Sequence, residues 1–141
     1  MEKLYVACDF GVRTSRIMLG TLNRQTLTVS ELRRFTTPVI NEKKTLQWNL
    51  PEIYRETLLA LGEIGAQEVS VVGISCSSWG ADYMLFDADD TLLTPVFHHA
   101  DPRSVDGVKA VSAKLSTDTI YDETGVQSRA GDTLFQLGAE S

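Results

Sequence analysis

The sequence predicts an α/β fold built as one domain over residues 1–141. Two patterns carry this prediction. β-prone runs separated by short polar turns open the chain, and an amphipathic helical stretch then precedes a short β-branched run. A length of 141 residues is enough for a sizeable core, and 43% hydrophobic with 23% charged residues is typical of a globular domain.

The overall charge and the cysteine usage narrow the functional classes. A formal net charge of −6 argues against a nucleic acid or an anionic membrane as partner. No apolar run is long enough to span a membrane, and the N-terminus turns polar at Asp9, so it lacks the core of a signal peptide. Cys8 and Cys76 both fall in stretches predicted as buried strands, so we expect two reduced, packed thiols in a cytoplasmic protein.

The first two predicted strands, residues 4–8 and 17–22, flank a polar stretch that runs from Asp9 to Arg16. Gly11 permits a tight turn and a close approach of a ligand to the backbone. Asp9, at the end of the first strand, is placed to act on Mg²⁺ through its waters. Hydroxyl groups and positive charges come from four further residues: Arg13, Thr14, Ser15 and Arg16. We interpret the stretch as a phosphate-binding hairpin, with a plain hairpin that has a polar tip as the alternative.

This hairpin is neither a Walker A loop nor a dinucleotide-binding loop, because the chain lacks both G-x-x-x-x-G-K-[ST] and G-x-G-x-x-G. Asp9-Phe10-Gly11 has the same sequence as the Asp-Phe-Gly magnesium motif of protein kinases. The chain has no H-R-D loop and no strand with Val-Ala-Ile-Lys, so that assignment is rejected.

The next segment predicts a third strand, a loop, a helix and a parallel strand. Residues 26–35 are strand-like and complete an antiparallel meander, and residues 36–45 read as a loop. Asn49 and Glu52 have the spacing of a capping box at the start of a helix that ends at Gly65. Residues 69–74 predict a strand buried on both faces and paired in parallel after the helical crossover.

The last third predicts a hairpin followed by three helices. Residues 75–80 form a small-residue loop, and residues 82–86 and 92–98 predict two strands around a turn at 87–90. The helices are expected at 104–115, at 117–123 with Gly125 as its end, and from 132 onward.

Taken together, these stretches resemble known proteins. A strand meander, a helix and a parallel strand, opened by Asp9-x-Gly11, resemble the ribonuclease H-like ATPase fold of sugar kinases, hexokinase, actin and the Hsp70 chaperones. Three later stretches resemble the FGGY carbohydrate kinases in order and spacing: residues 73–83 with Trp79-Gly80-Ala81-Asp82-Tyr83, residues 95–103 ending in Asp101-Pro102-Arg103, and residues 121–137. The nearest branch is rhamnulokinase.

The resemblance implies an ATP-dependent kinase that phosphorylates a hydroxyl of a ketose or polyol, with rhamnulose and xylulose as models. It implies that Asp9 holds the waters of Mg²⁺, and that the following residues line the ATP phosphates: Gly11, Val12, Arg13, Thr14, Ser15 and Arg16. It further implies a sugar site made by Trp79, Gly80, Asp82, Asp101 and Arg103. Structural alternatives stay open: Trp79 as a core residue, Asp82 as a loop cap, and Asp101 with Arg103 as an ion pair that shapes the loop.

The family's catalytic aspartate lies downstream of the matched region, so we expect no catalytic residue in this chain. The chain then corresponds to the N-terminal portion of domain I of a two-domain kinase, inactive alone. Its expected partners are ATP, a sugar and the remainder of the kinase, with a homodimer as a further option. Four positions depart from the rhamnulokinase pattern: Arg13, Ser15, Ser77 and His99.

Three other functions are weighed against the kinase. A non-catalytic nucleotide-binding domain, actin-like or regulatory, would share the Asp9-x-Gly11 hairpin. His98 and His99 are adjacent on a predicted strand and point to opposite faces, which makes them poor joint ligands of a metal. Residues 73–77 nearly match the G-x-S-x-G elbow of serine hydrolases, but the fifth residue is Ser and both histidines follow too soon.

Overall fold

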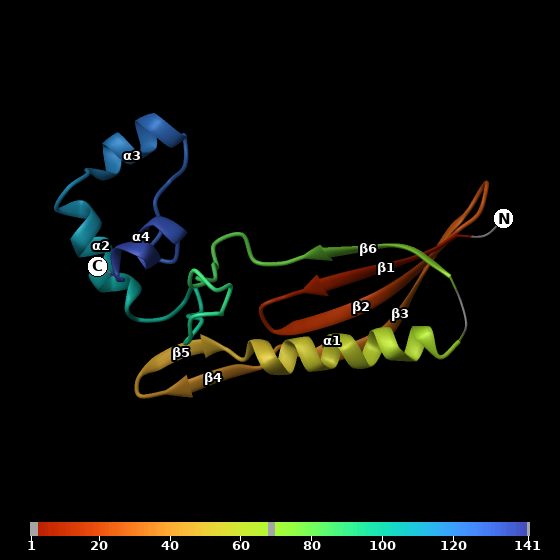
Figure 1. The fold of residues 1–141 in the computed structure, drawn as a ribbon. Helices are drawn as coiled ribbons and strands as arrows, with labels where there is room; N and C mark the ends of the chain where they lie inside the picture. The colour runs from red at the N-terminus through yellow and green to blue at the C-terminus, as the bar shows by residue number, and fades with distance from the viewer. Residues whose placement is uncertain (1–2, 68–69, 141) are drawn as a thin grey trace. The chain divides into compact units, whose positions relative to one another are not determined.

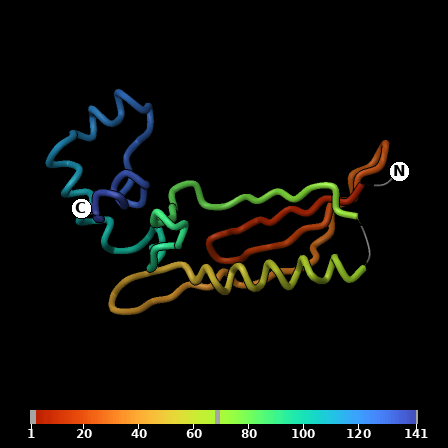
Figure 2. Tube along the Cα trace, viewed as in Figure 1, coloured from red at the N-terminus to blue at the C-terminus, as the bar shows by residue number. Residues whose placement is uncertain are grey.

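The computed structural model describes residues 3–67 and 70–140, and its chain divides into two compact units. The first unit runs up to Pro38 and continues over Asn49–Trp79, and the second comprises Val39–Trp48 and the chain from Gly80 onward. Figures 1 and 2 show the sheet and long helix of the first unit, and the short hairpin and three helices of the second.

A four-stranded sheet forms the frame of the first unit. Its strands are β1 (Lys3–Phe10), β2 (Thr14–Leu22), β3 (Leu27–Thr36) and β6 (Val71–Ser77), in the order β3-β2-β1-β6. β1, β2 and β3 pair antiparallel, and β6 pairs in parallel with β1. The predicted meander and the predicted parallel strand are therefore both confirmed.

Helix α1 (Leu50–Gly65) covers one face of this sheet (Figure 1). The Asn49 side chain accepts a hydrogen bond from the Glu52 N–H at 3.3 Å, which confirms the predicted N-cap. The core beneath the helix is made by two alternate residues of β1, one residue of β2 and one side of α1: Val6, Cys8, Ile17, Ala60 and Ile64.

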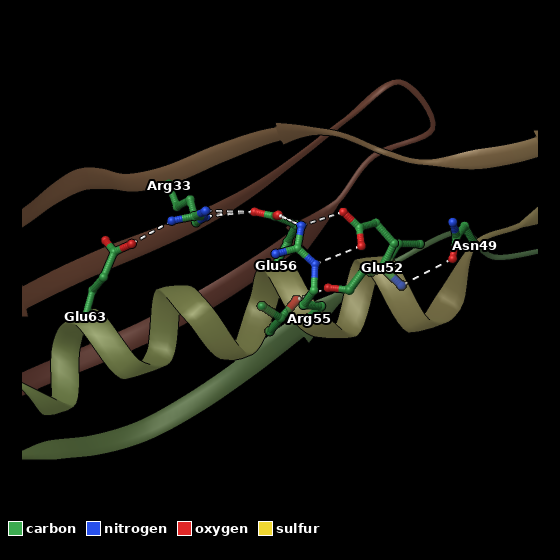
Figure 3. A network of polar contacts seen from close by, with 8 residues as sticks. Arg33, Asn49, Glu52, Arg55, Glu56 and Glu63 are labelled. Atoms are coloured by element: carbon green, nitrogen blue, oxygen red, sulfur yellow. Dashed lines mark hydrogen bonds and ion pairs between the residues drawn. The ribbon is translucent and has the colours of Figure 1, made fainter.

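An ionic network ties α1 to β3 (Figure 3). The Arg33 guanidinium of β3 contacts Glu56 at 2.9 Å and Glu63 at 2.6 Å, two carboxylates almost two turns apart on the helix. Arg55 continues the network to Glu52 and Glu56. Because one planar guanidinium is held by two separated carboxylates, the contact orients the helix along the strand as well as adding charge attraction.

Strand β6 differs from its prediction as a strand buried on both faces. It spans Val71–Ser77, so Ser75 to Ser77 extend the strand rather than form a loop, and Val69 of the predicted range lies outside the described residues. Val72 and Ile74 are 55% and 56% exposed. The β-branched composition correctly predicted a strand, but β6 lies at the sheet edge, with β1 as its one partner among the described strands.

The two cysteines are neighbours across β1 and β6, where Cys8 and Cys76 are register partners. Cys8 is 2% exposed, whereas Cys76 is exposed, which corrects the expectation of two buried thiols. Burial, reinforced by the neighbouring Cys76 thiol, raises the pKa of Cys8 to about 11.

The second unit opens with a hairpin that the sequence did not predict. Strands β4 (Val39–Glu42) and β5 (Thr45–Trp48) pair antiparallel in a region expected to be a loop. The two turn residues, Lys43 and Lys44, have φ values of 51° and 69°. Such two-residue turns favour Asn and Gly, so a Lys-Lys pair gave no turn signal.

The three predicted helices of the second unit are confirmed as α2 (Ser104–Ser112), α3 (Thr117–Thr124) and α4 (Thr133–Gly138). Gly125 follows α3 in the left-handed conformation, as its helix-ending role predicts. α2 is three residues shorter than expected. No helix in the described part of the chain is long and apolar enough to cross a membrane.

The predicted strands at 82–86 and 92–98 are wrong. These segments form only isolated bridges, Phe86 with Leu92 and Gln47 with Phe97. The second segment lies along β5 instead, because the Trp48 N–H donates to the Val96 carbonyl at 2.9 Å and the His98 N–H donates to the Leu46 carbonyl at 3.0 Å. The start of the second segment keeps its predicted partner, because the Leu93 N–H donates to the Leu85 carbonyl at 2.8 Å, and only its later part pairs with the hairpin that the sequence did not indicate.

Helices α2 and α4 cross at two glycines. A Cβ on Gly107 would lie 1.8 Å from the Phe135 carbonyl oxygen, and a Cβ on Gly138 would lie 2.7 Å from Cγ2 of Val111. No side chain fits at either contact, so the backbones of the two helices approach directly.

The burial of the two thiols predicts unequal alkylation. Iodoacetamide should label Cys76 rapidly at pH 8 and label Cys8 slowly, because the high pKa of Cys8 leaves little thiolate and the core shields it. Peptide mass spectrometry after timed labelling measures each site, and labelling in urea, where both react, is the control. Equal rates in the folded protein would contradict the buried placement of Cys8.

Candidate functional site

The turn between β1 and β2 is closed by its own backbone. The Gly11 N–H donates to the Thr14 carbonyl at 3.2 Å. A Cβ on Gly11 would lie 2.6 Å from that same carbonyl oxygen, so no side chain is tolerated. The close approach that the sequence analysis assigned to Gly11 is therefore made by the turn itself.

Thr37 stabilises this turn through two hydrogen bonds. The sequence placed it in a loop with no assigned role. Its hydroxyl donates to the Gly11 carbonyl at 2.6 Å, and its N–H donates to the Arg13 carbonyl at 3.1 Å. Because its one hydroxyl proton is used there, Thr37 accepts from the Ser15 hydroxyl, 2.8 Å away. Both hydroxyls are buried. The Ser15 side chain is thus committed to the fold, and its backbone lies in the central strand β2 between its register partners Phe10 and Phe35.

The charged residues of the hairpin lie on its outer surface. Asp9 and Arg16 are register partners on β1 and β2, and both are exposed. Ser77, the register partner of Asp9 on β6, donates its hydroxyl to an Asp9 oxygen at 3.1 Å. The remaining tip residues Val12 and Arg13 are exposed and Thr14 is half-buried. A carboxylate, a hydroxyl and a guanidinium therefore stand in a row at one end of three adjacent strands.

The environment of Asp9 fits a hydrated Mg²⁺. Mg²⁺ usually keeps several waters and is held by one or two carboxylates together with substrate phosphates, rather than by a cage of protein ligands. Asp9 offers one exposed carboxylate beside the turn, with one of its oxygens oriented by Ser77. Among the described residues, no group of three or more His, Cys, Asp or Glu side chains is arranged to hold a metal.

The predicted sugar loop begins where the second unit resumes. Trp79, the last residue of the first unit, is half-buried. Gly80 is exposed, and a Cβ built on it would meet no described atom within 4 Å. The next residue is held firmly, because the Ala81 carbonyl accepts from the Thr133 hydroxyl at 2.6 Å and from the Gln136 amide at 2.9 Å. Helix α4 thus fixes the loop just after Gly80.

The Asp82 carboxylate is occupied by three hydrogen bonds. One oxygen accepts from the indole N–H of Trp48 and from the backbone N–H of His99, both at 2.8 Å. The other lies 2.7 Å from Nδ1 of His99. The side chain is only 7% exposed. This geometry favours the alternative in which Asp82 fastens the loop over direct contact with a sugar.

His98 is a packing residue. Its ring stacks on Trp48 with centroids 4.1 Å apart, and its Nδ1 accepts from the Ala100 N–H at 2.9 Å. Burial is the main cause that lowers the pKa of His98, with the neighbouring His99 adding to it, so the ring is neutral at neutral pH. Its bonding differs from that of His99, whose Nδ1 faces a carboxylate.

Asp101 and Arg103 both serve the fold, but not as the ion pair considered above. The buried Asp101 carboxylate accepts from the backbone N–H groups of Leu46 and Arg103. The Arg103 guanidinium instead contacts Glu140 at 2.8 Å and the Tyr83 hydroxyl at 3.1 Å. Asp101 therefore joins β5 to the start of α2, and Arg103 reaches the end of α4.

The serine-hydrolase alternative finds no support in this geometry. Ser75, the candidate nucleophile, lies inside strand β6 (Val71–Ser77) rather than on a sharp strand-to-helix turn. A nucleophile elbow needs that turn to expose the hydroxyl.

The chain matches the FGGY family of carbohydrate kinases, N-terminal domain, over residues 4–138. It is 37% identical to a rhamnulokinase of Pectobacterium carotovorum and 34% identical to one of Pectobacterium atrosepticum. Each alignment covers 97% of this chain and 28% of the relative, so the chain spans a little over a quarter of these relatives' length.

Two solved structures share the fold. A gluconate kinase from Lactobacillus acidophilus superposes with a TM-score of 0.69 at 20% identity, over 89% of this chain and 25% of that one. A ligand-bound xylulose kinase from the same organism gives 0.66 at 20% identity, over 85% and 24%. These likenesses confirm the predicted ribonuclease H-like α/β fold.

The buried hydroxyl pair predicts a specific loss of stability. Thr37→Val keeps the β-branched shape but leaves the Gly11 carbonyl and the Ser15 hydroxyl without a partner, at a cost of about 1–3 kcal/mol. Urea unfolding measures this change. Thr36→Val, at the exposed neighbouring position, is the matched control and should change stability by less than about 0.5 kcal/mol. Equal effects of the two substitutions would contradict the assigned role of Thr37.

Proposed function

We propose, because this chain belongs to the FGGY family of carbohydrate kinases, that the whole protein transfers the γ-phosphate of ATP to a hydroxyl of a ketose or polyol. The observation that carries the proposal is the family match over residues 4–138 together with the closed hairpin at Gly11, which displays charged residues on its surface. The kinases named for rhamnulose and xylulose among the similar proteins suggest a substrate of that kind.

In this proposal the chain is the N-terminal part of domain I of a two-domain kinase. The match to an N-terminal domain and the 28% coverage of the rhamnulokinases support this placement. The base that takes the proton from the sugar hydroxyl would come from the remainder of the protein. In phosphoryl transfer the protein mainly positions the substrates and stabilises the negative charge of the phosphates, and these are the roles we assign to the residues of this chain.

The hairpin is assigned to the ATP phosphates. Gly11 keeps the turn tight: its N–H bonds the Thr14 carbonyl and its carbonyl accepts from Thr37, so the backbone N–H assigned to a phosphate is that of the exposed Val12. Arg13, Thr14 and Arg16 supply charge and a hydroxyl, and Ser15 contributes by holding the turn through its bond with Thr37. The hydrogen bonds from Thr37 hold the turn in one conformation before a ligand binds. This preorganisation lowers the conformational entropy cost of binding.

Mg²⁺, when bound, would neutralise charge on the β- and γ-phosphates. Asp9 is the residue of this chain assigned to it, through water, with Ser77 holding the carboxylate in place. Asp9 and Arg16 are register partners on adjacent strands. In this proposal Asp9 faces the Mg²⁺ ion and Arg16 faces the phosphates of ATP.

The sugar is assigned to the loop at Trp79 and Gly80. An indole face can pack on the apolar face of a sugar, and the bare backbone of Gly80 leaves room for hydroxyl groups. Asp82, Asp101 and Arg103 support this loop through the bonds described above, whatever contact each makes with the ligand. A cytoplasmic location, where ATP is present and free thiols stay reduced, and assembly as a homodimer complete the proposal.

The first test follows ADP release by the complete protein with a panel of ketoses and polyols. Turnover of at least one sugar is expected, and Asp9→Ala should lower kcat at least about a hundredfold with little change in sugar affinity, because the cation loses its protein contact. Asp89→Ala, at an exposed turn, is the control and should match the wild type.

Two outcomes would count against the proposal. ATP binding without any sugar-dependent turnover would favour a regulatory, actin-like role, and unchanged turnover in Asp9→Ala would remove Asp9 from the cation site.

Gly80→Val tests the sugar loop. Because a Cβ at Gly80 meets no described atom within 4 Å, the substitution should leave the melting temperature nearly unchanged and crowd only the ligand. The KM for the sugar should rise about tenfold or more, while the KM for ATP stays within about twofold. Normal sugar kinetics in this variant would place Gly80 outside the sugar site.

A further inference from the structure

We propose that His99 accepts a hydrogen bond from a neutral sugar hydroxyl through Nε2, and that Asp82 is the positioning residue that holds His99 for this contact. The proposal rests on the proposed sugar-kinase function and deepens it, since it assigns a specificity-determining residue to the sugar loop. In this proposal Asp82 acts by orienting His99 and does not contact the sugar itself.

Asp82 fixes His99 at two points. One carboxylate oxygen accepts from the His99 backbone N–H at 2.8 Å, and the other lies 2.7 Å from Nδ1 of its ring. The carboxylate is itself anchored by the Trp48 indole N–H at 2.8 Å. Neither the ring nor its backbone can turn without breaking a bond to a nearly buried carboxylate, so the imidazole is held in a single orientation.

In either neutral tautomer one ring nitrogen carries the proton, and the carboxylate determines which one it is. An ionised carboxylate only accepts hydrogen bonds, so Nδ1 must carry the hydrogen and Nε2 keeps a lone pair. Nε2 makes no hydrogen bond with any residue in the described ranges 3–67 and 70–140, and the side chain is 29% exposed. His99 therefore presents an oriented acceptor, which is the group that a sugar O–H requires.

His99 is joined to the proposed sugar loop through Asp82. Asp82 follows Gly80 by two residues, and α4 holds the intervening Ala81 through its carbonyl. The same carboxylate therefore connects the His99 ring to the loop that carries Gly80. The negative charge of Asp82 beside the ring favours a neutral hydroxyl over an anionic group at Nε2.

The neighbouring His98 shows what a purely structural imidazole looks like in this unit. It is buried, stacks on Trp48, and uses Nδ1 as an acceptor for the Ala100 N–H. His99 has the opposite features: partial exposure, a carboxylate at Nδ1 and an unused Nε2. Two adjacent residues of one type thus serve as candidate and internal control.

The test uses two amide substitutions in the complete protein. In His99→Asn the amide reaches only as far as Nδ1, so it can still bond Asp82 but cannot reach the ligand. In His99→Gln the amide reaches the place of Nε2. We expect the KM for the best ketose of the panel to rise about fivefold or more in His99→Asn and to recover substantially in His99→Gln, with the KM for ATP within about twofold in both.

Asp82→Asn tests the positioning role separately. An amide can still accept from Trp48 and from the His99 N–H, but its NH₂ would donate to Nδ1 and move the ring proton to Nε2. The acceptor then becomes a donor, and the sugar KM should rise about as much as in His99→Asn. His98→Asn removes a ring that stacks on Trp48 and lies 4.2 Å from the His99 ring, so it should lower the melting temperature and raise the sugar KM less than His99→Asn does.

The outcomes separate this proposal from the one on which it rests. Sugar turnover with an unchanged sugar KM in His99→Asn, equal losses in His99→Asn and His99→Gln, or an equal loss in His98→Asn would each overturn the role of His99 and leave the kinase intact. Absence of turnover by the wild-type protein with every sugar would overturn both proposals.

Discussion

The first unit depends on the pairing of β1 with a strand on each side. This register directs Val6 and Cys8 into the core under α1, and it brings Asp9 beside Arg16 and Ser77 at the strand ends. A slip of one residue would exchange the two faces of β1 and lose the core and the charged row together. Stability and the placement of the candidate phosphate site thus follow from one set of backbone hydrogen bonds.

In the second unit, charged side chains are used mainly to hold backbone segments. Asp82 fastens His99, Asp101 ties β5 to the start of α2, and Arg103 reaches Glu140 at the end of α4. Buried charges that satisfy each other or the backbone fix a single loop geometry. The residues left partly open beside these contacts include Gly80 and His99, whose side chain is 29% exposed.

Local signals were sufficient for most of the fold. The cap at Asn49, the β-prone run of β1 and the glycine after α3 each act within a few residues, and each prediction was confirmed. Errors arose where distant partners decide the outcome. The turn at Lys43 and Lys44 adopts positive φ without the usual residues, and the burial of β6 depends on neighbours that no local pattern can report.

The candidate site divides in the same way. Motif resemblance indicated the hairpin and the Gly80 loop as candidates, but it could not indicate Thr37 or distinguish a carboxylate that would touch a ligand from one that supports the backbone. Those roles are defined by contacts such as Thr37 with Gly11 and Asp82 with Trp48, which join residues 26 and 34 positions apart.

The glycine contact between α2 and α4 makes the loop sensitive to changes far from it. Because Gly107 lets the two helix backbones meet, it determines how closely α4 can approach α2. Thr133 and Gln136 of that same helix hold the Ala81 carbonyl next to Gly80. A single methyl group added at Gly107 would push α4 outward and loosen the segment at Ala81, so variation at this remote backbone contact would move the backbone beside Gly80 without altering any residue of that segment.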